Sequence, residues 1–284
     1  MTTDKKYQTE SLYDGISAHY QNIKTFYHEK NDIQEVVLFE NPVLGKMLML
    51  DGVTQVTLSD EFIYHEMMSH VPIFAHENPK NILIIGGGDG GIAREVLRHK
   101  TLEQVVMIEI DADVVEFSKQ YLPEISKGAF SHPNLQLKIA DGAAFVADTS
   151  QKFDVIIVDS TDPVGPGEVL FSKEFYQNCY RCLNKNGILV TQNGVPFMQP
   201  SELKQSVGFF RDIFNHGTCY RATIPTYAFG EMAMGFASDA DYSELTVKHI
   251  RQRFDASGLS MKYYTPAVHV AAFALPVYIE NIIA

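Results

Sequence analysis

The sequence predicts a doubly wound α/β fold, in which a mostly parallel sheet follows a small antiparallel β domain. From residue 81 onward, five short and nearly continuous apolar runs are separated by longer segments, several of them helix-like: NILIIG, QVVMIEID, LQLKIADG, FDVIIVDS and GILVTQNG. Near-continuous apolar strands that alternate with helices are typical of a parallel sheet covered on both faces. Between residues 35 and 57, short β-rich runs alternate with turn residues instead, which indicates a small antiparallel sheet.

The N-terminal part is expected to be rich in hairpins and to end in a helix. Turn residues at 41–42 and 51–52 separate its apolar runs, and the second pair, Asp-Gly, is a strong hairpin signal. The stretch SDEFIYHEMMSHVPIFAH then predicts a helix that begins after Ser59 or Asp60 and leads into Pro72.

The segments beyond the fifth apolar run extend the predicted sheet. TCYRATIP, EMAMGFAS and AAFALP are further strand candidates, which we expect to be antiparallel at one edge. The expected organisation is a β-strand domain over residues 1–64 and a Rossmann-like domain over residues 65–284.

Composition limits the class of partner. The formal net charge is -12, from 35 acidic and 23 basic side chains. This balance argues against nucleic acid or an anionic membrane as a partner and is compatible with a cationic substrate. No apolar run approaches the roughly 20 residues that span a bilayer, and the polar start MTTDKKYQTE has no signal-peptide core. Three cysteines, an odd number, fit a reducing cytoplasm, so we expect a cytoplasmic protein.

Polar side chains gather where the predicted strands end. In open α/β sheets, ligands bind outside the carboxyl ends of the strands. Four of the apolar runs lead to acids and the fifth leads to amides; these residues are Asp89, Glu109, Asp111, Asp141, Asp159, Asp162, Gln192 and Asn193. A single acid at a strand end is commonly a helix cap, but four acidic ends in register are harder to explain as caps. We therefore expect a functional site at this edge.

The glycine-rich loop after the first run indicates a nucleoside ligand. Gly86, Gly88 and Gly91 satisfy G-x-G-x-x-G, and Glu109 follows at the spacing of a ribose-binding acid. A dinucleotide would place its pyrophosphate against this loop, where Asp89 would repel it. A nucleoside with a cationic tail fits better. Decarboxylated S-adenosylmethionine keeps a sulfonium and an amine but lacks the carboxylate that Asp89 would repel.

The stretch DSTDPVGPGEVLFSKEF suggests both a proton acceptor and a lid. Asp159 and Asp162 flank two hydroxyl residues at a strand end, and the Pro- and Gly-rich segment 159–175 is expected to be a water-excluding loop. A carboxylate there can take a proton from an alkylammonium. Its partner can hold the freed amine in line with an electrophilic carbon.

Two apparent metal motifs do not match metal geometry. His65 and His70 in HEMMSH are five residues apart, so on a helix they diverge by about 140°. Cys179 and Cys182 leave only Cys219 as a further cysteine, whereas structural zinc takes four ligands. We expect buried cysteines and no metal.

Several long motifs, in the same order, resemble those of the spermidine synthases, most closely the bacterial enzymes. They are DGVTQVTLSDEFIYHEMMSHVP, GGGDGG, the acid at 109, ADG, DSTDPVGP and TPAVH, and the resemblance runs from about residue 7 to residue 280. It implies a methyltransferase-type sheet and an aminopropyltransferase. The enzyme would transfer the aminopropyl group of decarboxylated S-adenosylmethionine to putrescine, giving spermidine and 5′-methylthioadenosine. Thr265, where many relatives have Asn, is a small departure outside the other motifs.

The resemblance also implies roles for individual residues. Asp159 would be the general base, Asp89 would hold the aminopropyl ammonium, Glu109 would bind the ribose, and Asp141 with Gly142 would face the adenine. The nucleoside side would further include Gln34, Gln55, Gly86, Gly88 and Pro166. The diamine and aminopropyl channel would be lined by Tyr64, His65, Asp162, Gln192 and Tyr227. No metal or redox cofactor is implied, because the nucleoside is a co-substrate, and a homodimer or homotetramer is expected.

Four alternatives remain open from the sequence. A diamine methyltransferase would use intact S-adenosylmethionine, and Asp89 argues against its carboxylate. A relative within the same family would act on cadaverine, agmatine or spermidine. A non-catalytic homologue would be free to lose Asp89, Asp159 and Asp162, which are all present. An NAD-dependent oxidoreductase is the least favoured alternative, because Asp89 would repel the pyrophosphate of the dinucleotide.

Overall fold

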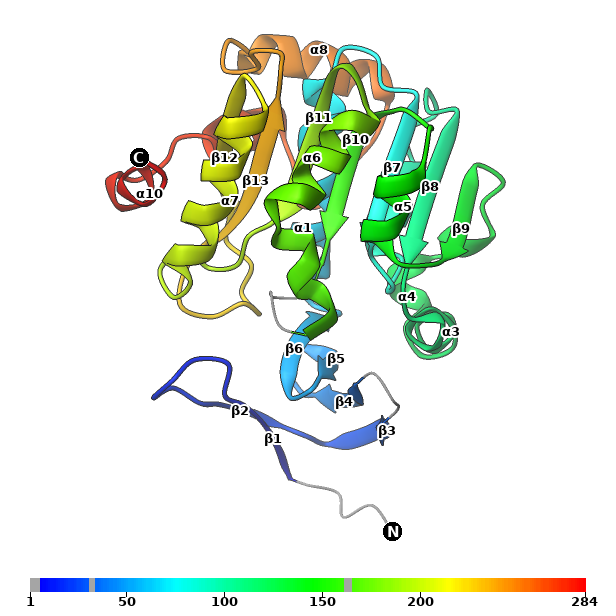
Figure 1. Ribbon diagram of the computed structural model, residues 1–284. Coiled ribbons are helices and arrows are strands. Elements are labelled where there is room, and N and C mark those ends of the chain that lie inside the picture. The colour runs from blue at the N-terminus through cyan, green and yellow to red at the C-terminus, as the bar shows by residue number, and fades with distance from the viewer. Residues whose placement is uncertain (1–5, 31–33, 161–164) are drawn as a thin grey trace. The chain divides into compact units, whose positions relative to one another are not determined.

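The computed structural model describes residues 6–30, 34–160 and 165–284, and the chain separates into two compact units (Figure 1). The smaller unit is formed by Met1–Phe62 together with Ile224–Ala228, and the larger unit by Ile63–Thr223 together with Phe229–Ala284. The smaller unit therefore includes a short loop that lies far along the sequence.

The smaller unit consists of two antiparallel sheets. Its strands are β1 (Tyr7–Glu10), β2 (Ala18–Gln21), β3 (Lys24–Lys30), β4 (Glu35–Asn41), β5 (Gly45–Leu50) and β6 (Val53–Thr57). Strands β1 and β2 pair with each other, and the four-stranded sheet has the order β3-β4-β5-β6. Asp51 and Gly52 both have positive φ, 48° and 80°, as a two-residue hairpin turn requires. The predicted N-terminal antiparallel sheet is confirmed.

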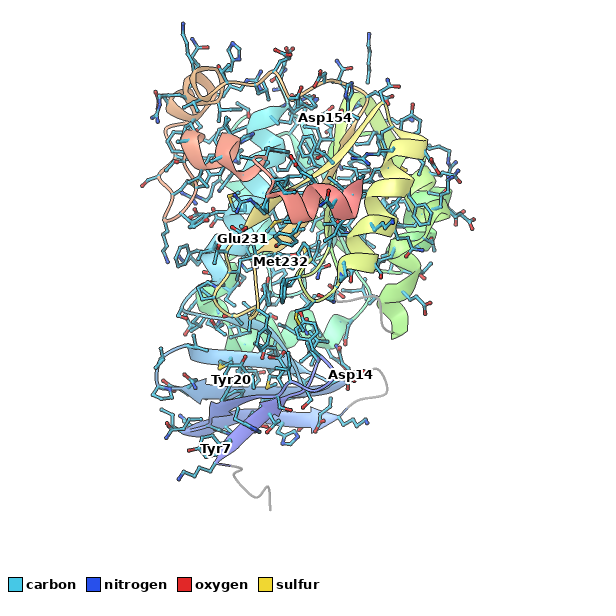
Figure 2. All side chains as sticks on the ribbon, turned by 90° about the vertical axis from the view of Figure 1, so that its left-hand side faces the viewer. Tyr7, Asp14, Tyr20, Asp154, Glu231 and Met232 are labelled. Carbon is cyan, nitrogen blue, oxygen red and sulfur yellow. The ribbon has the colours of Figure 1, made fainter. Side chains whose placement is uncertain are left out.

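A partly buried acid ties the two sheets of the smaller unit together. Glu10 on β1 accepts a hydrogen bond from the backbone N–H of Thr54 on β6 (2.7 Å). Its other oxygen accepts one from the hydroxyl of Tyr20 on β2 (3.1 Å), labelled in Figure 2. Burial, with the negative charge of Glu10, raises the pKa of Tyr20 to about 12, so the phenol stays a hydrogen-bond donor at neutral pH.

The larger unit is built on a seven-stranded sheet of order β12-β13-β11-β10-β7-β8-β9. Its strands are β7 (Asn81–Gly86), β8 (Gln104–Glu109), β9 (Leu135–Ile139), β10 (Phe153–Asp159), β11 (Leu183–Gln192), β12 (His216–Ala222) and β13 (Met232–Ser238). Strands β7 to β11 run parallel, and β13 and β12 continue the sheet antiparallel at one edge. These are the five predicted parallel strands and two of the predicted edge strands.

Helices cover both faces of this sheet. They are α1 (Glu61–Ala75), α2 (Gly91–Leu97), α3 (Ala112–Tyr121), α4 (Pro123–Ser126), α5 (Gly142–Asp148), α6 (Lys173–Cys182), α7 (Pro200–Ile213), α8 (Val247–Ser257), α9 (Pro266–Ala272) and α10 (Val277–Ile283), with short 3₁₀ helices η1 (Ala129–Ser131) and η2 (Gly165–Phe171). Figure 1 shows α5, α6 and α7 in front of the sheet, and α1 and α8 behind it. The central strands β7 and β10 are therefore buried on both faces, which explains their continuous apolar runs.

Three expectations about local structure were wrong in detail. AAFALP is not a strand: its first two residues end α9, and the other four connect α9 to α10. Helix α9 begins at Pro266, and the side chain of Thr265 caps it by accepting from Val268 N (3.1 Å). The helix expected to lead into Pro72 continues through it to Ala75, because α1 is buried along most of its length and packing outweighs the lost hydrogen bond. The predicted loop 159–175 includes η2 and the start of α6.

The amino end of β10 serves a structural purpose. Asp154, labelled in Figure 2, accepts hydrogen bonds from the backbone N–H of Lys80 (2.7 Å) and Asn81 (2.9 Å) and from the Asn184 amide (2.8 Å). It thereby joins the starts of β7 and β11 to β10. Asp159 lies at the other end of the same strand.

Gly86→Ala should destabilise the protein by at least about 3 kcal/mol, because a Cβ at this position would lie 2.0 Å from the carbonyl oxygen of Asp159 and φ is +83°. Gly208→Ala is the matched control, since nothing lies within 4 Å of a Cβ there and the site is in α7. That change should stabilise by about 0.5–1 kcal/mol. Urea unfolding monitored by circular dichroism measures both, and equal effects would contradict this packing account.

Candidate active site

The carboxyl ends of the parallel strands bring the predicted acids to one edge of the sheet. Asp159, the last residue of β10, is in register with Gly86, the last residue of β7. Glu109 ends β8, which pairs with β7 on its other side. The glycine-rich loop that follows β7 therefore begins between Asp159 at the end of β10 and Glu109 at the end of β8.

The glycines in this loop allow other groups to approach its backbone. A Cβ on Gly88 would lie 2.7 Å from Val114 and 3.1 Å from a carboxylate oxygen of Glu109. A Cβ on Gly91 would lie 2.2 Å from the imidazole of His65. Any larger residue at these two positions would push the loop away from Glu109 or from α1.

Asp89 is held by the loop and by α1. Its Oδ1 accepts a hydrogen bond from the backbone N–H of Gly91 (2.8 Å), and its Oδ2 lies 3.2 Å from Nε2 of His65. The His65 side chain is almost fully buried, whereas that of Asp89 keeps some exposure, 15%. Asp89 is thus fixed in orientation and still open to a ligand.

Asp159 is held by Tyr64, the residue that precedes His65 in α1. The hydroxyl of Tyr64 donates a hydrogen bond to Asp159 Oδ1 at 2.5 Å. Desolvation, followed by the negative charge of Asp89, raises the pKa of Asp159 to about 6, against the lowering effects of Tyr64 and His65. A carboxylate with a pKa near neutrality is suited to general acid–base catalysis. Consecutive residues of α1 therefore hold the two acids.

Glu109 is a third acid with a raised pKa. It is only 8% exposed, and its Oε1 accepts a hydrogen bond from the backbone N–H of Asp111 (2.9 Å). Desolvation raises its pKa to about 7 despite backbone hydrogen bonds from Asp111 and Ile110. A ligand that donates hydroxyl hydrogens here would stabilise the ionised carboxylate.

Two other strand-end acids are helix caps. Asp111 accepts from Asp113 N (2.8 Å) and Val114 N (3.3 Å) at the start of α3. Asp141 likewise caps α5, and a Cβ on Gly142 would lie 2.4 Å from Ile85, so glycine lets α5 approach β7. The position of an acid at a strand end therefore does not show by itself whether its carboxylate caps a helix.

The other residues assigned by resemblance lie in several places. Gln192 ends β11 and is 7% exposed. Pro166 belongs to η2, and Asp162 lies outside the described residues.

Three further residues belong to the smaller unit: Gln34 directly precedes β4, Gln55 lies in β6, and Tyr227 lies in the 224–228 loop. The Tyr227 hydroxyl donates to the Gln55 carbonyl oxygen (2.6 Å).

The contacts of Tyr64 with Asp159 and of His65 with Asp89 were missed by motif reasoning, which assigned these α1 residues only to a substrate channel. The partners are far apart in sequence, and the only available signal was that the two polar residues are consecutive in a helix. A buried cluster around His70 was also missed.

The suspected metal motifs have other partners. His65 faces Asp89, whereas His70 faces Glu95. Within the described ranges, no group of three or more His, Cys, Asp or Glu side chains is arranged to hold a metal ion. The three cysteines are free and buried, and burial raises their pKa, which disfavours the thiolate.

No single helix in the described part of the chain is long and apolar enough to cross a membrane, although the bent pair α9 and α10 meets both criteria when taken together.

The sheet, the glycine-rich loop and the raised-pKa acids define a Rossmann-like enzyme with an acidic site at its strand ends. Residues 61–249 match the spermine/spermidine synthase domain, and residues 7–57 match the spermidine synthase tetramerisation domain. A polyamine aminopropyltransferase of Pseudomonas syringae is 52% identical over 271 residues, 95% of each chain. One from a Ruegeria species is 52% identical over 281 residues, 99% of each chain.

Solved structures agree with these matches. A spermidine synthase in complex with the transition state analogue AdoDATO has a TM-score of 0.92 at 38% identity, covering 98% of this chain and 94% of that one. The spermidine synthase of Thermotoga maritima has a TM-score of 0.89 at 37% identity, covering 98% and 93%. The chain therefore belongs to the spermine/spermidine synthase family of aminopropyltransferases.

Asp159→Asn should stabilise the unliganded protein at pH 8. The folded-state pKa of Asp159 lies above its usual 3.8, at about 6, so the folded state loses stability as pH rises between these values and does not regain it above them. Removing the charge should recover on the order of 1–2 kcal/mol at pH 8, and this gain should disappear below about pH 4.

The measurement is urea unfolding across that pH range, with Asp148→Asn, an exposed acid at the end of α5, as the control. A pH-independent gain, or the same gain in the control, would show that desolvation and charge repulsion at Asp159 are not the cause.

Proposed function

We propose that this chain is a spermidine synthase, which transfers the aminopropyl group of decarboxylated S-adenosylmethionine to putrescine and releases 5′-methylthioadenosine. The observation that carries the proposal is the pair of acids Asp89 and Asp159, held by α1 at one edge of the sheet, where the charge of one raises the pKa of the other. Such a site favours cationic ligands, and both substrates are cationic. The family match and the names of the relatives support this assignment.

The donor binds along the ends of β7, β8 and β9. Asp89 holds the ammonium of the aminopropyl tail, and the ribose hydroxyls donate to Glu109, whose desolvated carboxylate gains from such donors. Asp141 and Gly142 face the adenine at the start of α5. By resemblance, the nucleoside side also takes in Gly86, Gly88 and Pro166.

Asp159 acts as the general base on the amine. It accepts a proton from the alkylammonium of putrescine, and the freed nitrogen lone pair attacks the propyl carbon bonded to sulfur. The new C–N bond forms as the C–S bond breaks. The electron pair of the C–S bond stays on sulfur, so that 5′-methylthioadenosine leaves as a neutral thioether. Tyr64 orients the carboxylate through its hydrogen bond. By resemblance, Tyr64, His65 and Gln192 line the amine channel.

The assembly and location follow from weaker indications. The match of residues 7–57 to a tetramerisation domain supports an oligomer, and we propose a homodimer or homotetramer. The three free cysteines are consistent with a cytoplasmic enzyme.

The proposal is tested by incubating the protein with putrescine and either decarboxylated or intact S-adenosylmethionine, and identifying products by mass. Spermidine from the decarboxylated donor alone is expected. Formation of N-methylputrescine from the intact donor would show that the enzyme is a methyltransferase and not an aminopropyltransferase. A product only with cadaverine, agmatine or spermidine as acceptor would correct the amine.

Asp159→Asn should reduce kcat by about 10²- to 10⁴-fold while leaving donor binding nearly unchanged, because it removes the proton acceptor and not a nucleoside contact. In the wild type, kcat/KM should rise with pH through an apparent pKa near 6, a step that the variant should lose.

Asp154→Asn is the matched control, at the structural end of the same strand. It should lower stability and leave kcat of the folded protein close to wild type. Near-normal turnover of Asp159→Asn would remove Asp159 as the base.

Asp89→Asn should lower the preference for decarboxylated over intact S-adenosylmethionine. Two quantities measure this preference: kcat/KM for spermidine formation from the decarboxylated donor, and 1/Ki for inhibition by the intact donor. The preference is the first divided by the second. A loss of about 10- to 100-fold is expected, because one charge contact with the ammonium and one repulsion of the carboxylate are both removed. Asp113→Asn, an exposed acid on α3, should leave the ratio unchanged. An unaltered ratio in Asp89→Asn would mean that Asp89 does not read the donor's tail.

A further inference from the structure

Helices α1 and α2 are joined a second time, deeper in the protein than the His65–Asp89 contact. Nε2 of His70 on α1 lies 3.0 Å from a carboxylate oxygen of Glu95 on α2. Nδ1 of His70 lies 2.8 Å from Nε2 of His99, just beyond the end of α2. The exposed fractions of His70, Glu95 and His99 are 0%, 4% and 6%, so the three form a buried polar chain.

The chemistry of these groups fixes where the protons lie. Burial lowers the pKa of His70 and of His99, so both imidazoles are neutral at pH 7. Burial alone would raise the pKa of Glu95, but the hydrogen bond from His70 and the charges of two arginines lower it overall, so Glu95 is ionised and can only accept. His70 Nε2–H therefore donates to Glu95, and His99 Nε2–H donates to His70 Nδ1.

Two arginines extend this chain to other elements. Arg94 donates to Glu95 (2.7 Å) and to the carbonyl oxygen of Ile125 in α4 (2.6 Å). Arg98 hydrogen-bonds to Glu95 and to the carbonyl oxygen of Ser260. The charge of Glu95 is thus balanced by hydrogen bonds from His70, Arg94 and Arg98, and these side chains tie the C-terminal half of α2 to its surroundings.

The two contacts are separated by similar distances along α1 and along α2. His70 follows His65 by five residues on α1, and Glu95 follows Gly91 by four on α2, which correspond to about 7.5 Å and 6 Å of helix. A single contact would let one helix slide or rotate against the other, whereas two contacts at different depths fix both. The close approach of the His65 ring to Gly91 leaves no room for sliding at the first contact.

We propose that His70 is a positioning residue: by bonding Glu95 and His99, it sets the register of α2 against α1 and thereby holds Asp89 at the right place relative to Asp159. The inference rests on the proposed function, in which Asp89 binds the ammonium of the donor. Loss of His70 would then weaken recognition of the donor tail more than the chemical step.

The neighbouring residue Glu66 provides a matched control. It is 2% exposed and accepts hydrogen bonds from three consecutive backbone N–H groups, those of residues 262–264, each at 2.8 Å. Glu66 therefore anchors the same helix as His70, at similar burial, but to the C-terminal segment and not to α2. A purely structural role of α1 would make the two residues equivalent.

The experiment compares His70→Phe, His70→Gln and Glu66→Gln in the full-length protein. Phe keeps the ring volume and removes both hydrogen bonds, whereas Gln keeps an N–H donor for Glu95. His70→Phe should raise KM for decarboxylated S-adenosylmethionine by about 3- to 30-fold and lower the donor preference by a similar factor, with kcat and KM for putrescine changed less. His70→Gln should recover most of this loss. Glu66→Gln should lower the urea midpoint and leave the donor preference unchanged.

Unchanged donor KM and preference in folded His70→Phe would overturn the inference, as would an equal change in Glu66→Gln. If His70→Phe does not fold, His99→Phe is measured instead, because it removes only the hydrogen bond between His99 and His70. A smaller change in donor KM and donor preference, in the same direction, supports the inference. No change in either overturns it. Asp89→Asn is measured in parallel. If that variant keeps the wild-type preference, the assigned role of Asp89 fails, which is distinguishable from failure at His70.

Discussion

Asp89 and Asp159 lie at one edge of the sheet, close enough that the charge of Asp89 contributes to the raised pKa of Asp159. In the empty protein this arrangement is unfavourable, because like charges repel and a desolvated carboxylate loses hydration. A cationic ligand relieves both effects when it binds. One constraint thus accounts for the preference that we propose for a donor with an ammonium tail and for an amine as acceptor.

The fold maintains this unfavourable arrangement with contacts that have little freedom to relax. The register of β10 against β7 fixes Asp159, and the positive φ of Gly86 turns the chain beside it. Consecutive residues of α1, Tyr64 and His65, then reach the two acids. The desolvated, like-charged acids lower the stability of the folded protein. The buried core around the central strands and the hydrogen bonds of His70 between α1 and α2 offset this cost.

The sheet could be predicted from sequence because continuous apolar runs mark strands buried on both faces. Local signals failed where tertiary packing or capping decided: α1 continues through Pro72, and the expected strand AAFALP is the end of α9 and the loop after it. The site was predicted only in part. Asp141 has the same sequence pattern as the other strand-end acids, and the pattern did not show that it also caps α5. The Tyr64–Asp159 bond joins residues 95 positions apart and depends on how α1 docks.

The central claim is that Asp159 is kept at a raised pKa until positive charge enters the site. The most direct measurement is the ¹³C chemical shift of its carboxyl carbon as a function of pH, assigned by its loss in Asp159→Asn, in the free protein and with decarboxylated S-adenosylmethionine bound. The account predicts titration near pH 6 in the free protein and at a clearly lower pH with the donor bound. Titration near the ordinary value of 3.8 in the free protein, or no change on binding, would contradict it.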